Sequence, residues 1–216
     1  MQLDRPLAVI TSSVDGDVLT AMAHRRAVRS TAGQLQYYLK RHSVEGIRRS
    51  LKRLEEQGVV QSRRSGNTHA YVLNREHLAT AAIVELASQR ERFVECLAIE
   101  FAKWQTPPAY AALFGSTVSD AMRPQDEINL FIAYADGIQR ELDEQIDVLA
   151  QNIRAWTGNR ANIATMADGE AARRTDDELL LTVRWNGQCV YGSSSWVEYQ
   201  FLQARELARS GELPAD

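Results

Sequence analysis

The chain has 216 residues, of which 44% are hydrophobic and 25% are charged, an ordinary composition for one large globular domain or two small ones. It has no apolar run long enough to cross a bilayer and no basic-then-apolar signal peptide, so the sequence predicts a cytoplasmic protein without a membrane partner. Cys96 and Cys189 stand alone rather than in C-x-x-C pairs, which argues against a zinc site and against a disulfide framework.

The net charge of -3 conceals two segments of opposite sign. Residues 1–75 carry 13 Lys and Arg against 6 Asp and Glu, whereas residues 76–216 carry 12 against 22. A basic segment joined to an acidic one predicts that one part of the chain meets a polyanion and the other does not.

Three helices are expected in the basic segment. The first spans Asp15 to Arg25, where apolar residues recur at helical spacing. The second begins at Thr31, which forms a capping box with Gln34. The third begins at Ser43, a good N-cap, and runs to about Gln57 before Gly58 ends it.

After Gly58 the apolar pattern changes from period 3.6 to period 2. Val59 to Arg64 reads as a strand, Ser65 to Asn67 as a turn, and Thr68 to Leu73 as a returning strand. Three helices followed by a hairpin with a basic tip predict a winged helix-turn-helix in residues 1–75.

The third predicted helix divides into an apolar face and a cationic face. Val44, Ile47, Leu51 and Leu54 fall on one side, so the other side should be exposed and fit the major groove. Arg48 and Arg49 are expected at base edges, because arginine can bridge guanine O6 and N7, and Lys52 and Arg53 at phosphates. Together with the hairpin tip, the predicted DNA contacts are Ser43, Glu45, Arg48, Arg49, Lys52, Arg53, Arg63, Arg64 and Asn67.

The stretch from Arg49 to Val60 also resembles bacterial winged-helix regulators, in which a Leu-x-x-Leu-x-x-x-Gly-Leu/Val-Val segment joins the recognition helix to the wing. The resemblance covers residues 15–74 and implies binding to double-stranded DNA. Two alternatives remain, a basic face that is merely solvated and a winged helix that contacts only proteins.

Residues 76 to about 104 read as one long helix that ends at Thr106-Pro107-Pro108. Strands and helices alternate beyond it, so an α+β fold is expected, with a mixed sheet in the last part. The predicted division is residues 1–75 for DNA binding, 76–106 for a linker or dimerisation helix, and 107–216 for a second domain. Four strands are expected in this second domain, at residues 110–114, 128–134, 161–166 and 188–191. Three helices are expected at residues 138–156, 176–185 and 196–209.

Leu113-Phe114-Gly115-Ser116, followed by Asp126 to Ile132, resembles the polymerase-β-like nucleotidyltransferases, particularly the small bacterial ones. The resemblance covers about residues 107–192. In that family, two carboxylates two residues apart on one strand share a face with a third from a neighbouring strand, and they hold two magnesium ions. The matching positions here are Glu127, Asn129 and Asn162, while Asp126 is expected on the opposite face.

One carboxylate and two amides supply too little charge for two Mg²⁺ ions, so the resemblance implies a degenerate nucleotidyltransferase, with no catalytic residues, no metal and no cofactor. Gly115, Ser116 and Arg123 are possible nucleotide contacts. The sequence therefore predicts a homodimeric transcriptional regulator whose pseudoenzyme domain dimerises or senses a nucleotide-like ligand. The alternatives are an active nucleotidyltransferase that uses Mg²⁺ and a nucleotide on a nucleic acid or protein acceptor, and an antitoxin-like partner of another protein.

Overall fold

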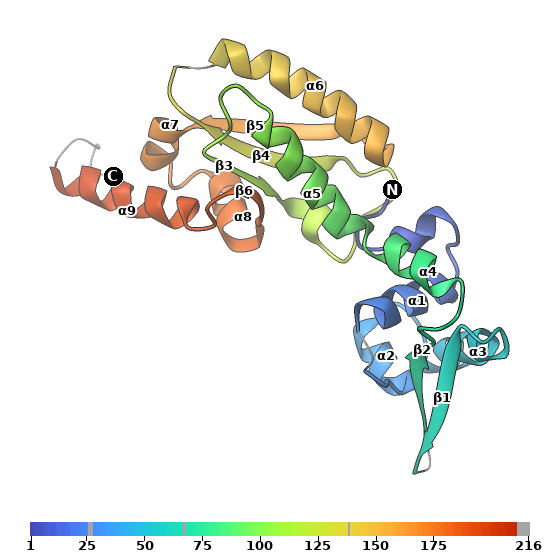
Figure 1. The fold of residues 1–216 in the computed structure, drawn as a ribbon. Coiled ribbons are helices and arrows are strands. Elements are labelled where there is room, and N and C mark those ends of the chain that lie inside the picture. Colours follow the sequence, from blue (N-terminus) through green and yellow to red (C-terminus); the bar gives the residue numbers. More distant parts are fainter. Residues whose placement is uncertain (26–27, 67, 138, 211–216) are drawn as a thin grey trace. The chain divides into compact units, whose positions relative to one another are not determined.

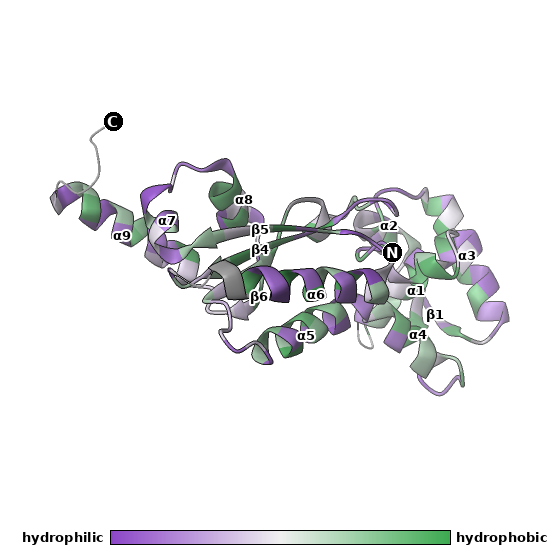
Figure 2. Cartoon of the chain, turned by 90° about the horizontal axis from the view of Figure 1, so that it is seen from above, coloured by the Kyte–Doolittle hydropathy of each residue, from purple (hydrophilic) through white to green (hydrophobic). Residues whose placement is uncertain are grey.

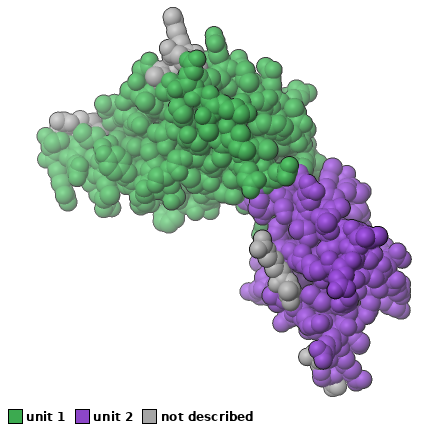
Figure 3. All heavy atoms as spheres, viewed as in Figure 1, with its two compact units in different colours: residues 1, 92–216 green, residues 2–91 purple. Residues whose placement is uncertain are grey.

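The computed structural model describes residues 1–25, 28–66, 68–137 and 139–210, and it confirms the α+β class. Helices accompany two separate sheets, one of two strands and one of four (Figure 1). The chain forms two compact units, which we call the N-terminal unit (residues 2–91) and the C-terminal unit (residue 1 with residues 92–216) (Figure 3). The boundary between them falls inside the segment predicted as a linker, 76–106.

The N-terminal unit contains three helices followed by a hairpin, in the predicted order and close to the predicted bounds. The elements are η1 (Pro6–Val9), α1 (Val14–His24), α2 (Ala32–Tyr38), α3 (Val44–Glu56), β1 (Val60–Ser65), β2 (Thr68–Leu73) and α4 (Thr80–Ala87). The two strands are antiparallel, and Arg64 pairs with His69 beside the tip. Ser30, just before α2, pairs with Tyr71 through backbone bonds of 2.8 and 2.9 Å, so the hairpin is attached to the helices along one edge.

Local sequence explains where the helices of this unit begin. Thr31 and Gln34 form the predicted capping box, each side chain bonded to the other residue's backbone N–H. Ser43 Oγ accepts from the N–H of Gly46 and caps α3. Gly58, at φ +76°, follows α3 and takes the left-handed conformation that a chain reversal requires. The apolar core beneath the helices includes Val18, Leu35, Ile47, Leu51 and Leu73.

The C-terminal unit is built on a mixed sheet with the strand order β5-β4-β3-β6. Its strands are β3 (Tyr110–Leu113), β4 (Ile128–Tyr134), β5 (Ala161–Ala167) and β6 (Gln188–Gly192), so the four strands predicted for this region are confirmed. β4 and β5 run parallel, whereas β3 is antiparallel to both β4 and β6. Helix α5 (Gln89–Ala102) begins three residues before the unit boundary. The other elements of this unit are η2 (Gly115–Val118), α6 (Gln139–Thr157), α7 (Asp168–Arg173), α8 (Glu178–Asn186) and α9 (Trp196–Ser210).

Helices cover both faces of this sheet. Figure 2 shows α8 on one side and α5 and α6 on the other. On the α8 side, Phe131 and Ala133 of β4 pack with side chains of α7, α8 and α9 in one cluster. Their neighbours Leu130 and Ile132 are equally buried but point to the opposite face, because side chains alternate along a strand. Burial on both faces explains why β4 reads as a continuous apolar run.

The single long helix predicted for residues 76 to 104 is wrong. The structure forms α4 and α5 with Ser88 between them. The Ser88 hydroxyl donates to the carbonyl oxygen of Val84 at 2.9 Å, and Ser88 leaves helical geometry at φ -90° and ψ 17°. A serine that bonds back onto its own helix in this way competes with regular helical geometry. Helix α7, which precedes the predicted helix 176–185, was not expected.

Among the helices of the described residues, none combines the length and the apolar character of a membrane span.

Candidate functional site

Helix α3 exposes the face that the sequence predicts to meet DNA. Ile47 and Leu51 are fully buried, whereas the side chains of Arg48, Arg49 and Lys52 are 65%, 78% and 77% exposed. The apolar side contributes to the core of the N-terminal unit, so the cationic side is fixed outward by packing. The predicted division of this helix into two faces is therefore confirmed.

Each cation on that face has an acidic neighbour. Glu45 lies 3.7 Å from Arg48 and 3.8 Å from Arg49, measured from carboxylate oxygen to guanidinium nitrogen. Lys52 is 4.0 Å from Glu56, and Arg53 pairs with Asp15 of α1. The pairs with Glu45 and Glu56 are exposed on both sides, and such pairs contribute about 0–1 kcal/mol. Arg48, Arg49 and Lys52 can therefore exchange these partners for other anions at little cost.

The structure divides the four cations between the two flanks of α3. On one flank, Arg48 and Lys52 line a groove of about 700 Å³ together with residues of α2 and the hairpin, among them Thr31, His69 and Tyr71. On the other flank, Arg49 and Arg53 line a pocket of about 440 Å³ beside the start of α1. From their positions along the helix, the sequence predicts that Arg48 and Arg49 contact base edges and that Lys52 and Arg53 contact phosphates. In the structure, Arg48 instead shares a flank with Lys52, and Arg49 with Arg53, because residues four positions apart lie on the same side of a helix.

The hairpin carries the second predicted cluster of cations. Arg63 and Arg64 are exposed near its tip, and Arg64 Nε donates to the carbonyl of Gly66 at 3.2 Å. Ser62 Oγ donates to Glu55 Oε1 of α3 at 2.5 Å, which joins β1 directly to α3. Asn67, the remaining predicted contact at the tip, lies outside the described residues. Ser43, another predicted contact, is exposed at the start of α3, where it serves as the N-cap.

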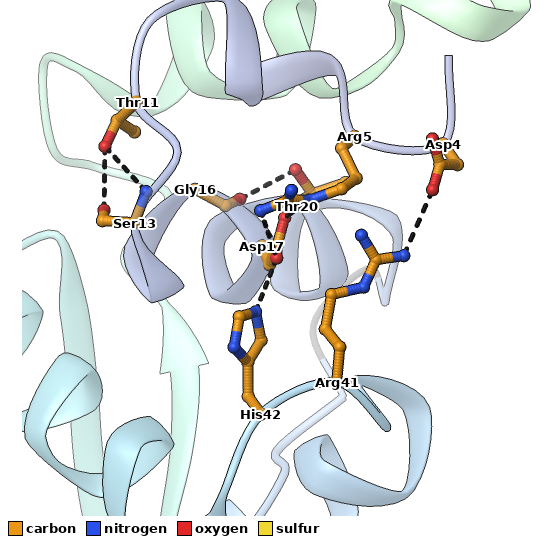
Figure 4. Close-up of polar contacts among 9 residues, drawn as sticks. All are labelled: Asp4, Arg5, Thr11, Ser13, Gly16, Asp17, Thr20, Arg41 and His42. Atoms are coloured by element: carbon orange, nitrogen blue, oxygen red, sulfur yellow. Dashed lines mark hydrogen bonds and ion pairs between the residues drawn. The ribbon is translucent and has the colours of Figure 1, made fainter. Parts of the chain in front are cut away.

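A buried carboxylate lies beneath the turn that leads into α3, and sequence reasoning missed it. Asp17 of α1 is 6% exposed and accepts two bonds of 2.9 Å from Nε and Nη2 of Arg5. Its Oδ2 is also 2.6 Å from Nε2 of His42, the residue before the N-cap Ser43 (Figure 4). Burial alone would raise the pKa of Asp17, but the bonds from Arg5 and His42 outweigh it and hold this pKa below its ordinary value.

A second ion pair joins the same turn to the N-terminal segment. Arg41 Nη2 lies 3.1 Å from Oδ2 of Asp4, whose side chain is 3% exposed (Figure 4). Burial raises the pKa of Asp4, and the Arg41 guanidinium opposes that effect. Neighbouring residues of the turn, Arg41 and His42, are thus bonded to two separate carboxylates. The only sequence signal for this arrangement was an aspartate beside Val18 on the buried face of a predicted helix.

In the C-terminal unit the structure brings together three of the residues singled out from the sequence. Asn129 of β4 and Asn162 of β5 are directly paired in the parallel register. Asn162 Nδ2 donates to Asn129 Oδ1 at 2.9 Å, and Asn129 Nδ2 donates to Ser116 Oγ at 3.2 Å. Ser116 follows Gly115, which has φ +60° and whose added Cβ would lie 3.4 Å from Asn129 Nδ2. The result is a chain of neutral hydrogen bonds from the loop after β3 across two strands.

The other residues predicted for this site make no described side-chain hydrogen bond to Ser116, Asn129 or Asn162. Glu127 is exposed, just before β4, and its carbonyl accepts from Thr117 Oγ1 at 3.5 Å. Asp126 Oδ2 accepts from the backbone N–H of Arg123 at 2.8 Å, so the Asp126 carboxylate closes a turn. The Arg123 side chain is exposed.

This donor set does not fit a pair of divalent cations. Asn129 and Asn162 supply amide oxygens, and one of those oxygens already accepts a hydrogen bond from the other side chain. Magnesium requires hard anionic oxygens in near-octahedral geometry. Within the described residues, no group of three or more His, Cys, Asp or Glu side chains is placed to hold a metal ion. The arrangement can offer hydrogen bonds to a polar ligand but little charge.

No family model matches the chain, and no curated protein sequence matches it. One solved chain that it resembles comes from the crystal structure of a mutant of the toxin-antitoxin MntA-HpeT. The match has 14% sequence identity and a TM-score of 0.37, and it covers 55% of this chain and 89% of the solved one. Similarity at that level does not establish a shared fold.

Proposed function

We propose that the protein is a regulator of transcription that binds double-stranded DNA through its N-terminal unit. The observation that carries this proposal is helix α3. It buries Ile47, Leu51 and Leu54 on one side, and its opposite side presents Arg48, Arg49, Lys52 and Arg53 to solvent. The exposed arginines Arg63 and Arg64 of the neighbouring hairpin extend the cationic surface. A helix of this kind fits the major groove of B-DNA, with the hairpin reaching the flanking backbone or groove.

The first prediction concerns Arg48, which lies in the first half of α3 on the flank that faces the hairpin. Replacing Arg48 with alanine should weaken binding to the best site by about 1–3 kcal/mol and relax the preference at one base pair. Replacing Lys52 with alanine should weaken binding to all duplexes more evenly, because a phosphate contact carries no sequence information. Selection of bound fragments from random or genomic DNA would identify the site, and fluorescence anisotropy would then measure both variants.

The wild-type protein supplies the control for this prediction. Its affinity should fall steeply with salt, since each neutralised phosphate contributes about 0.9 to the slope of log K against log salt concentration. A wild-type protein that shows no preference for any duplex over bulk DNA at moderate salt would contradict the proposed function. If Arg48→Ala and Lys52→Ala lose the same affinity for selected and for scrambled DNA, Arg48 does not recognise a base.

We propose a non-catalytic role for the C-terminal unit, in dimerisation or in binding a nucleotide-like ligand. The neutral chain of Ser116, Asn129 and Asn162 supports this role, because a nucleotidyltransferase reaction depends on metal charge at the developing oxyanions. An active nucleotidyltransferase is the competing function. It requires that Glu127 and the amides of Asn129 and Asn162 hold the metal ions that supply this charge.

The second prediction is that the protein is a homodimer. A single recognition helix covers a short site, whereas two-fold symmetric proteins read half-sites about one helical turn apart. Light scattering at micromolar concentration should give twice the chain mass of 24.3 kDa, and the selected DNA should be palindromic. Phe93, Leu97 and Phe101 of α5 are buried within the single chain, so these three residues of the predicted linker or dimerisation helix are not available for a subunit contact. A monomer both with and without DNA would exclude the dimer.

A further inference from the structure

The pocket on the α1 side of α3 contains unsatisfied polar groups as well as cations. It has a volume of about 440 Å³ and is lined by Ser13, Val14, Asp15, Gly46, Arg49, Ser50 and Arg53. Ser50 is only 4% exposed, and its Oγ has no hydrogen-bond partner among the described residues. Buried hydroxyls in folded proteins are normally bonded. An unpartnered hydroxyl beside two arginines indicates that a ligand completes the site.

Asp15 presents a second unpartnered group in the same pocket. One of its oxygens pairs with the Arg53 guanidinium, whereas Oδ1 is buried and has no partner in the described part of the chain. The Asp15 side chain is 16% exposed, and that of Arg53 is 58% exposed. Only one of the two carboxylate oxygens of Asp15 therefore has a partner among the described residues. A phosphate has the same charge sign and similar acceptor geometry, and it can replace a carboxylate on a guanidinium.

The start of α1 adds backbone donors to the pocket. Ser13 is the N-cap residue, but its side chain makes no capping bond. Its Oγ is instead bonded to Thr11 Oγ1 at 2.8 Å (Figure 4). The first-turn N–H groups of α1 thus lack a side-chain cap, and such groups favour an anion. Beside two arginines, they complete a surface suited to an oxyanion.

We propose that this pocket binds a phosphodiester of the DNA backbone, and that Asp15 competes with that phosphate for Arg53. The inference rests on the proposed function and extends it. Arg49, expected from the sequence at base edges, contacts the backbone together with Arg53. The Ser50 hydroxyl, which is buried in the unbound chain, turns toward the pocket and donates to the same phosphate. In the unbound protein the Asp15–Arg53 pair must open before DNA binds, so Asp15 lowers the affinity for every duplex irrespective of its sequence.

The test is a double-mutant cycle on the full chain, with the selected duplex and a scrambled one as probes. Asp15→Asn should tighten binding to both duplexes by roughly two- to fivefold, since the Asp15–Arg53 ion pair no longer has to be broken. The slope of log K against log salt concentration should steepen by up to about 0.9. In the wild type, the Asp15 carboxylate that Arg53 leaves takes up a cation when DNA binds, and Asp15→Asn removes that uptake. Arg53→Gln should weaken both duplexes, and adding Asp15→Asn to it should restore little.

Glu85→Gln is the matched control, because it removes one negative charge from an exposed position on α4 of the same unit. Its effect measures general repulsion of DNA, and the gain from Asp15→Asn must exceed it. Ser50→Ala provides an independent arm. Removing an unpartnered hydroxyl should leave the thermal midpoint unchanged or raise it, while duplex affinity falls. A purely structural serine would not separate those two readouts.

Each outcome decides one question. If the wild-type protein binds no duplex, the proposed function fails. Suppose instead that the protein binds DNA, but Asp15→Asn raises duplex affinity no more than Glu85→Gln does, or raises it equally when Arg53→Gln is also present. Asp15 then does not compete for Arg53, and this inference fails while the proposed function stands. An increase in affinity that exceeds the Glu85→Gln control and disappears in the Arg53→Gln background supports the inference.

Discussion

Replacing Asp17 with asparagine should lower the free energy of unfolding of the N-terminal unit by about 3–5 kcal/mol, the usual result of removing one partner from a buried ion pair. Asp17 accepts three bonds, two from Arg5 and one from His42, and its side chain is 7% exposed. Asparagine keeps the size of the side chain but removes the carboxylate that is hydrogen-bonded to the largely buried Arg5 guanidinium. A loss of this size is a large fraction of the stability of an ordinary domain.

The tryptophans make this effect measurable unit by unit. All four tryptophans of the chain lie beyond residue 91, at Trp104, Trp156, Trp185 and Trp196. Their fluorescence therefore follows unfolding of the C-terminal unit, whereas circular dichroism follows the helices of both units. Asp17→Asn should shift the part of the urea transition seen only by circular dichroism. Asp147→Asn, at an exposed position of α6, is the matched control and should shift neither signal appreciably.

The pH dependence of this effect has a definite sign. The pKa of Asp17 is lowered in the folded chain from 3.8, because its bonds to Arg5 and His42 outweigh burial. The stability that the ionised carboxylate contributes is therefore fully present above about pH 4 and is lost as the pH falls through the lowered value. Asp4, whose raised pKa has the opposite effect, is present in both proteins. A difference between wild type and Asp17→Asn that is small at pH 7 would show that the buried pair does not form.

Local patterns in the sequence predicted the elements that depend on near neighbours. The faces of α3 follow from apolar residues three and four positions apart, and the caps Thr31 and Ser43 act within one turn. The cluster around Asp17 could not be found in this way. Its partners Arg5 and His42 lie 12 and 25 residues away along the chain, and no periodicity records such a pairing.

The pairing of Asn129 with Asn162 was anticipated for a different reason. Periodicity identifies β4 and β5 as strands but does not fix their register, and only the resemblance to nucleotidyltransferases put both residues at one site. The break at Ser88 was missed because the apolar spacing continues through it, while the deciding bond is a hydroxyl-to-carbonyl contact. The division of the α3 cations between two flanks likewise required the positions of α1 and the hairpin.

Restoring charge to the paired amides should make the stability of the C-terminal unit depend on divalent cations. The double variant Asn129→Asp, Asn162→Asp loses the bonds to Ser116 and between the two side chains, each contributing about 0.5–1.5 kcal/mol. It also places like charges directly opposite one another on adjacent strands, two residues from Glu127. We expect the free energy of unfolding to fall by about 2–4 kcal/mol in the absence of divalent cations, from the lost hydrogen bonds and the added repulsion together. A cation at 100 times its Kd should restore about 2.7 kcal/mol.

Three comparisons isolate the role of charge in that prediction. The control variant Asn129→Ala, Asn162→Ala loses the same hydrogen bonds without gaining carboxylates, so Mg²⁺ or Mn²⁺ should not stabilise it. Adding Glu127→Gln to the double aspartate variant should weaken the response, because Glu127 would be the third carboxylate. The wild-type protein should show neither cation-dependent stabilisation nor transfer of label from nucleoside triphosphates to RNA or protein acceptors. Metal-dependent labelling by the wild type that Glu127→Ala abolishes would overturn the non-catalytic role, since one carboxylate beside two amides would then suffice to hold the metal charge that the reaction needs.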